Sequence, residues 1–128
     1  MPAASLDIEL DYDKLGKAGS LLGSGGLLVM DEDVDVVDMA RFLTEFFAEE
    51  SCGKCTPCRE GLAHLNGWVT DLAAGCGTKE SLASIEKMGE AMSDTCFCAL
   101  GKTAAVPIVS VMKHFPQDVE RKLIKPIN

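Results

Sequence analysis

The sequence predicts a mainly α-helical protein, a four-helix bundle that carries a cysteine-ligated cluster and follows a short partial β segment. Two hydrophobic patterns predict this fold. Near the N-terminus apolar residues alternate with acidic ones, as in a half-buried strand, and from residue 33 they recur about every 3.6 residues, as in an amphipathic helix. A third observation predicts the site: residues 50–61 read ESCGKCTPCREG and place Cys52, Cys55 and Cys58 three residues apart.

The β prediction covers residues 1–32. One strand is indicated by four apolar residues, Leu6, Ile8, Leu10 and Tyr12, which alternate with Asp7, Glu9 and Asp11. A second short strand is expected at Leu27–Met30. The segment between the two strands, DKLGKAGSLLGSGG, is rich in glycine and is therefore expected to form turns with one helical turn inside.

The helical prediction covers residues 33–128, and its first two helices flank the cysteine string. The first helix is expected from about 34 to 49, where apolar side chains recur on one side. The second is expected from about 57 to 73, with Thr56 as its N-cap and Pro57 at its first position. The cysteine string therefore lies in the connecting loop and the first turn of the second helix.

The third and fourth helices complete the predicted bundle. Thr78 is expected to cap the third helix, whose apolar residues Leu82, Ile85, Met88 and Met92 share one face. The fourth helix should follow Gly101. Pro107 lacks a backbone N–H, so it should either kink that helix or lie in its first turns.

The three clustered cysteines predict an iron–sulfur centre. Cys52 and Cys55 lie in the loop and Cys58 in the first helical turn, so their thiols meet at a helix N-terminus, whose free N–H groups and dipole favour thiolates. The spacing C-x₂-C-x₂-C supplies three ligands of a [4Fe–4S] cluster, which needs four. The expected fourth ligand is Cys98, in the string DTCFCALG, because two bundle helices and a turn can fold it back onto the others.

Other thiol chemistries fit the spacing less well. Structural zinc usually shows two separated C-x₂-C pairs, whereas the second group here, Cys96 and Cys98, has the spacing C-x-C. A thioredoxin-type centre needs only two cysteines in a βαβ setting. Cys76 and Cys96 are interpreted as small buried hydrophobes or bystanders, although Cys96 lies close enough to Cys98 to misligate.

The charge of the chain limits its partners. A formal charge of −8 and a pI near 4.6 argue against nucleic acid and polybasic membrane binding, and favour protein partners. The longest uncharged run, Ala18–Met30, is too short and too rich in glycine to span a bilayer, so no direct membrane insertion is expected. With no export signal and six cysteines, the expected location is cytoplasmic, or peripheral on the inner face of the cytoplasmic membrane.

Three strings, GSGGLLVMDED, FFAEESCGKCTPCREG and CALGKTAAVPIVSVMKHF, resemble the C-terminal region of the NADH-binding, FMN-containing subunit of respiratory complex I. The family includes the diaphorase subunits of NAD-linked hydrogenases and formate dehydrogenases. The resemblance extends over roughly residues 5–122. It implies that residues 1–32 are the tail of a ubiquitin-like (soluble-ligand-binding) β domain, and that residues 33–128 form a helical bundle in which Cys52, Cys55, Cys58 and Cys98 hold one [4Fe–4S] cluster.

The resemblance also implies a function: a [4Fe–4S] electron-transfer module of an NADH-dependent oxidoreductase. Single electrons would come from reduced FMN and pass to further iron–sulfur centres in partner subunits. In the family FMN and NADH are bound by an upstream domain, which these 128 residues do not match, so the chain is expected not to be catalytic alone. The alternative is a non-redox, zinc-stapled protein-interaction domain.

Overall fold

A computed structural model describes residues 5–124, and within them the chain is mainly α-helical, as predicted. Seven helices occur in this range. The chain divides into two compact units between Val34 and Asp35. None of the helices in residues 5–124 is both long and apolar enough to cross a membrane.

In residues 5–34 the first unit contains one short helix, α1 (Tyr12–Lys17). Asp11 caps it by accepting hydrogen bonds from the backbone N–H groups of Asp13 and Lys14, both at 3.0 Å. Leu15 is the only buried residue of α1. With so little core, this unit depends on local turns and caps.

The predicted partial β segment is not confirmed, because residues 5–34 contain no strand. Tyr12, expected at the end of the first strand, instead begins α1. Leu6 and Leu10 are exposed, and so are the three apolar residues Leu27, Leu28 and Val29. An alternating sequence forms a strand only when a neighbouring strand pairs with it, and none does so in the described part of this unit.

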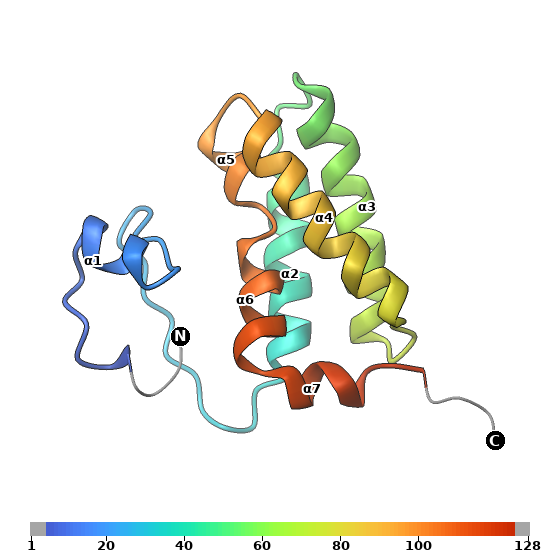
Figure 1. Cartoon of the computed structure of the whole chain (residues 1–128), viewed down its shortest axis with the longest axis horizontal. Helices are drawn as coiled ribbons and strands as arrows, with labels where there is room; N and C mark the ends of the chain where they lie inside the picture. The colour runs from blue at the N-terminus through green and yellow to red at the C-terminus, as the bar shows by residue number, and fades with distance from the viewer. Residues whose placement is uncertain (1–4, 125–128) are drawn as a thin grey trace. The chain divides into compact units, whose positions relative to one another are not determined.

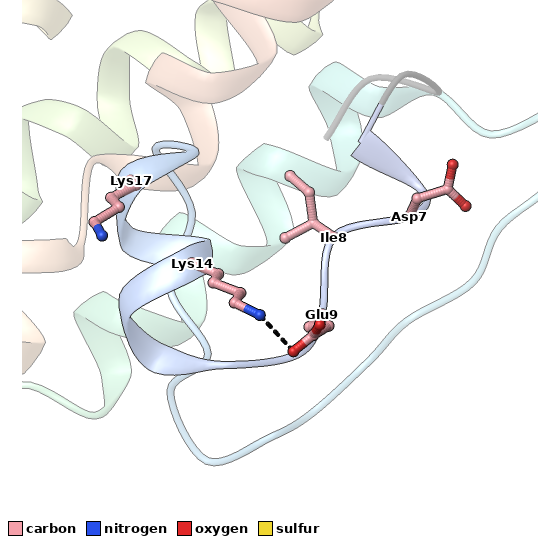
Figure 2. A pocket seen from close by; sticks show the side chains of 5 residues that line it. All are labelled: Asp7, Ile8, Glu9, Lys14 and Lys17. Atoms are coloured by element: carbon pink, nitrogen blue, oxygen red, sulfur yellow. Dashed lines mark hydrogen bonds and ion pairs between the residues drawn. The ribbon is translucent and has the colours of Figure 1, made fainter.

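A pocket on the first unit is lined by Asp7, Ile8, Glu9, Lys14 and Lys17 (Figure 2). Lys14 forms an ion pair with Glu9 across it, at 2.5 Å between Nζ and Oε2. Both side chains of this pair are more than half exposed, so water screens it strongly. The pocket therefore offers surface charge but no enclosed site.

The second unit begins with three long helices, α2 (Val36–Glu49), α3 (Thr56–Ala73) and α4 (Lys79–Thr95). Asp35 caps α2 through the N–H groups of Val37 and Asp38. Thr78 caps α4 as predicted, in a capping box with Ser81. The N-cap of α3 is Cys55, not Thr56, so a cysteine itself occupies the start of this helix.

The predicted fourth helix is split. It forms α5 (Ala99–Thr103) and α6 (Val106–His114), and α7 (Pro116–Arg121) follows. Pro107 lies in the first turn of α6, where its missing N–H breaks no helical hydrogen bond. A bundle of four continuous helices is therefore not confirmed; instead α2, α3 and α4 pack with a fourth, interrupted helical segment (Figure 1).

One continuous core joins these helices. Leu62, Leu65, Val69 and Leu72 of α3 are its centre, and it includes Ile85, Met92, Ile108 and three cysteines, Cys55, Cys58 and Cys96. On α2 the buried residues are Val37, Ala40 and Thr44, whereas Phe42 and Phe46 are at least half exposed. The cysteines are therefore part of the packed interior and are not attached to its surface.

The end of the second unit formed by α7 is tied by Lys122. Its Nζ pairs with Asp35, the cap of α2, at 2.5 Å and donates to the carbonyl of Ala73 at the end of α3, at 3.1 Å. Nearby, Gly77 and Leu123 form an isolated parallel β-bridge. We call this region the Lys122 end. The opposite end, which holds the start of α3, the end of α4 and α5, is called the cysteine end (Figure 1).

Candidate metal centre

The loop before α3 is built around Cys58. The Ser51 hydroxyl lies 3.2 Å from the Cys58 sulfur and 3.2 Å from the backbone nitrogen of Gly53, from which it accepts a hydrogen bond. Gly53 has a positive φ of 67°, a conformation that glycine adopts without a steric penalty. Arg59 then donates to the Gly53 carbonyl at 2.8 Å. Arg59 therefore fixes the loop as well as placing positive charge beside it.

The three cysteines of the string differ in exposure. Cys55 and Cys58 are buried, at 7% and 4% exposed, whereas Cys52 is exposed in the loop. Cys55 is the N-cap of α3 and Cys58 is the third residue of the helix, in its first turn. Two of the predicted ligands are therefore buried at a helix N-terminus, and the third lies at the surface beside them in sequence.

The second cysteine segment lies against the first. Cys98 is exposed and is the N-cap of α5, and Cys96, the C-cap of α4, is 3% exposed. The close approach occurs at Gly101. A Cβ on Gly101 would stand 2.7 Å from the Cys96 sulfur and 3.2 Å from the Cβ of Cys58, too close for any residue but glycine. Gly101 therefore allows α5 to pack directly on the first turn of α3.

Two thiols at this junction have opposite electrostatic environments. The backbone N–H groups of Phe97 and Cys58, together with the Cys96 thiol, interact with the Cys55 sulfur and lower its pKa. Burial raises the pKa of Cys96 to about 11, and the neighbouring Cys55, Cys58 and Cys98 sulfurs add to that rise. The site thus stabilises the thiolate form of Cys55 and the neutral form of Cys96.

The donor set fits a sulfur-ligated cluster in chemistry and in backbone placement. Each of the two cysteine segments has a cysteine at a helix N-cap, Cys55 in one and Cys98 in the other. The thiols of Cys55, Cys58 and Cys98 all contribute to the raised pKa of Cys96. The side chains have not converged, since no three Cys, His, Asp or Glu side chains in residues 5–124 form a group that could hold one metal ion. Cys76 is exposed just beyond α3, near the Lys122 end.

Two residues of the site, Ser51 and Gly101, were not predicted from the sequence, whereas Cys96 is buried, as its interpretation as a small buried hydrophobe expected, and Cys76 is exposed. The spacing C-x-C at Cys96 is visible in the sequence, but only the fold shows that Cys96 is buried between the two cysteine segments. Gly101 follows Cys98 by three residues, and a glycine at the start of a helix signals close packing only when its neighbour is known. Ser51 carries no spacing signal.

Comparison with known proteins gives one family and consistent relatives. Residues 38–122 match the model of the NADH-ubiquinone oxidoreductase-F iron–sulfur binding region. The chain is 41% identical over 115 residues to the HndC subunit of the NADP-reducing hydrogenase of Solidesulfovibrio fructosivorans, covering 90% of this chain and 24% of that protein. It is 43% identical over 118 residues to the F subunit of the NADH-quinone oxidoreductase of Streptomyces coelicolor, covering 92% of this chain and 26% of that protein.

A solved structure agrees. The chain is similar to an NAD⁺-reducing [NiFe]-hydrogenase in the H₂-reduced state, with a TM-score of 0.72 and 35% identity over 78% of this chain and 17% of that one. The chain spans about a quarter of the length of the curated relatives described above. About three quarters of each of these relatives therefore has no counterpart in the present 128 residues.

Proposed function

The chain belongs to the family of NADH-ubiquinone oxidoreductase-F iron–sulfur binding regions, and from this membership we propose that it is the electron-transfer module of an NADH-dependent oxidoreductase. Its cofactor is a [4Fe–4S] cluster, as the family model and the quinone oxidoreductase relatives support. When bound, such a cluster accepts and releases one electron at a time. The residues of this chain hold it, set its surroundings and exclude water from part of it.

We assign the ligands to Cys52, Cys55, Cys58 and Cys98. The observation that carries this assignment is the contact at Gly101, which brings the segment of Cys98 against the first turn of α3, although Cys58 and Cys98 are 40 residues apart. Cys55 and Cys58 approach from the buried side, and Cys52 and Cys98 from the exposed side.

The surroundings suit an anionic, thiolate-ligated group. Backbone N–H groups of Phe97 and Cys58 stabilise negative charge at Cys55, and the N-terminus of the long helix α3 adds its positive dipole end. Hydrogen bonds to ligand sulfurs and burial are two of the means by which a protein sets the potential of such a centre. The exposed side, with Cys52, Phe97 and Cys98, is where a donor or acceptor can approach.

The rest of the proposal concerns the parent protein. Electrons would arrive singly from reduced FMN, bound with NADH by an upstream domain of the same parent chain, and leave to iron–sulfur centres of partner subunits. Residues 1–32 would be the tail of the β domain. Residues 33–128 would be the cluster-binding bundle. The relatives named above, subunits of a hydrogenase and of a quinone oxidoreductase, support this arrangement.

An iron and acid-labile sulfide assay on the anaerobically purified chain tests the proposal. We expect about four iron and about four sulfide per chain, the composition of the cluster, with its broad visible absorbance bleached by dithionite. One zinc per chain with no sulfide would overturn the redox function in favour of a zinc-stapled interaction domain. Neither metal nor sulfide after anaerobic reconstitution with iron and sulfide would overturn both.

A further inference from the structure

The Ser51 hydroxyl contacts a proposed ligand without being one itself. Its oxygen lies 3.2 Å from the sulfur of Cys58, in the first turn of α3. Cys58 is only 4% exposed, and Ser51, in the loop after α2, is partly buried. Water therefore has little access to this sulfur, and the hydroxyl is a polar group placed to bond to it.

The surroundings of Ser51 determine which atom of the pair donates. The backbone N–H of Gly53 donates a hydrogen bond to the Ser51 oxygen at 3.2 Å. A hydroxyl oxygen can accept this bond and still donate its own hydrogen. A thiolate has no hydrogen to donate, so when Cys58 is a metal ligand the Ser51 O–H is the donor and the Cys58 sulfur is the acceptor.

Gly53 and Arg59 hold the hydroxyl in this position. Gly53 has a φ of 67°, which a residue with a side chain rarely adopts, and in this conformation its N–H reaches the Ser51 oxygen. Its carbonyl accepts a hydrogen bond from the Arg59 guanidinium at 2.8 Å. Arg59 directly follows Cys58 in α3, so the loop is tied to the helical turn that carries the sulfur. The Ser51 hydroxyl is therefore preorganised to donate to that sulfur.

We propose that Ser51 is a positioning residue that holds the Cys58 sulfur and raises the reduction potential of the cluster by donating its O–H hydrogen bond to that ligand. The inference rests on the proposed function. One electron from the donor adds one negative charge, which is shared with the ligand sulfurs, and no proton moves. A hydrogen-bond donor to a ligand sulfur stabilises this more negative state more than the oxidised state, so the potential rises.

A purely structural role for Ser51 is the competing explanation. Serine side chains often bond to backbone groups nearby in sequence, which stabilises a turn without any contact to a ligand. The bond from Gly53 alone would support that role, and the contact with the Cys58 sulfur is the additional observation. The two explanations differ in what they predict. A structural residue affects cluster content and thermal stability, whereas a donor also affects the potential and the hydrogens coupled to the cluster.

The test compares the wild type with three variants of the full chain, purified anaerobically. Ser51→Ala removes the hydroxyl, and Ser51→Thr keeps it. Ser84→Ala is the matched control, because the Ser84 hydroxyl donates to the carbonyl of Glu80 within α4, in the half of the helix far from Cys96. Each protein is titrated with dithionite and followed by electron paramagnetic resonance. Electron–nuclear double resonance in H₂O and D₂O then identifies the exchangeable hydrogens coupled to the reduced cluster.

We expect Ser51→Ala to keep the iron, sulfide and helical circular dichroism of the wild type. Its midpoint potential should be lower, and an exchangeable hydrogen coupling of the wild type should be absent. Ser51→Thr should recover both properties at least in part, because it keeps the donor. Ser84→Ala should match the wild type in both.

Equal potentials in wild type and Ser51→Ala would overturn the inference. A lowered potential with every exchangeable coupling retained would overturn it too, because that result would show an effect of loop geometry. Loss of the cluster from Ser51→Ala would show that the hydroxyl is needed for assembly rather than for the potential, which also contradicts the inference. A wild type that contains no cluster would instead refute the proposed function, and the inference with it.

Discussion

The two ends of the helical unit are held together in different ways. At the Lys122 end, polar groups of distant segments bind each other directly. Lys122 forms an ion pair with Asp35 and a hydrogen bond to the carbonyl of Ala73, and Gly77 forms a β-bridge with Leu123. At the cysteine end, the segments meet by close packing at Gly101 and by thiols, four of which are the proposed ligands. The Lys122 end is therefore held by polypeptide groups alone, whereas the cysteine end would gain its main cross-link from the proposed cluster.

Loss of a single ligand should have the largest effect, and only at the cysteine end. Replacing Cys52, Cys55, Cys58 or Cys98 by Ser should abolish the visible [4Fe–4S] spectrum, because each thiolate holds one iron corner. The helical circular dichroism should remain, since the core of Leu62, Leu65 and Leu72 is unaffected. Cys76→Ser is the control and should keep the spectrum. A cluster that survives Cys98→Ser but not Cys76→Ser would refute the ligand assignment.

Removal of the cluster should separate the two ends by hydrogen exchange. A cofactor that binds only the folded state adds several kcal/mol of stability, and here that stability acts on the segments it cross-links. We expect apo protein to lose amide protection at residues 50–60 and 94–102 and to keep it at 72–78 and 119–124. Full exchange throughout α2, α3 and α4 in apo protein would mean that the metal makes the whole fold. Unchanged protection at the cysteine end would mean that no cluster binds there.

A substitution at Gly101 should disturb the cysteine end through packing alone. In Gly101→Ala the added Cβ meets Cys96 and Cys58, so overpacking should destabilise the chain by about 1–3 kcal/mol and reduce its cluster content. Gly67→Ala is the matched control. Gly67 is exposed within α3 and a Cβ there meets nothing within 4 Å, so alanine should stabilise by about 0.5–1 kcal/mol. Equal effects at the two glycines, measured by thermal unfolding and iron content, would refute the close approach.

For the cysteine end, the sequence predicts which helices and cysteines are present better than it predicts how they contact each other. Helical periodicity locates both ends of α2 and α3, and the cap residue Thr78 locates the start of α4, to within about two residues. The sequence favours Thr56 over Cys55 as the cap of α3, since threonine is the commoner N-cap and no sequence rule anticipates a cysteine there. The contact of Gly101 with Cys96 and Cys58 arises from helices that meet only in the fold, so no local pattern in the sequence predicts it.

The Lys122 end and the first unit are predicted less well. Nothing in the sequence indicates that Lys122 reaches Asp35 and Ala73, because long-range contacts of a surface lysine have no periodicity. The interruption between α5 and α6 is anticipated only through Pro107. In the first unit the alternating residues Leu6–Tyr12 predict a strand, but alternation specifies a strand only where a sheet provides the partner.

The smallest predicted effect lies at the Lys122 end and depends on pH. Burial alone would raise the pKa of Asp35, but hydrogen bonds from Lys122 and from the backbone N–H groups of Asp38 and Val37 outweigh it and lower the pKa below 3.8. A carboxyl whose folded pKa is lowered stabilises the fold above its unfolded pKa, and that contribution is lost as the pH falls through the folded value. Asp35→Asn keeps an N-cap and removes only the charge, whereas Asp35→Ala removes both.

We expect Asp35→Asn to cost less than about 1 kcal/mol at neutral pH, since the ion pair with Lys122 is partly exposed. Asp35→Ala should cost about 1 kcal/mol more, the usual contribution of a helix cap. The measurement is urea unfolding of the apo chain from about pH 7 to about pH 2.5, a range that spans the titration of carboxyl groups. The difference between wild type and Asp35→Asn should shrink as the pH falls from about 3.8 and disappear once the pH is below the lowered folded pKa of Asp35, where the wild-type carboxyl is protonated as well, whereas the deficit of Asp35→Ala should persist. A constant deficit of Asp35→Asn at every pH would mean that this end is held by shape, with no contribution from the charge of Asp35.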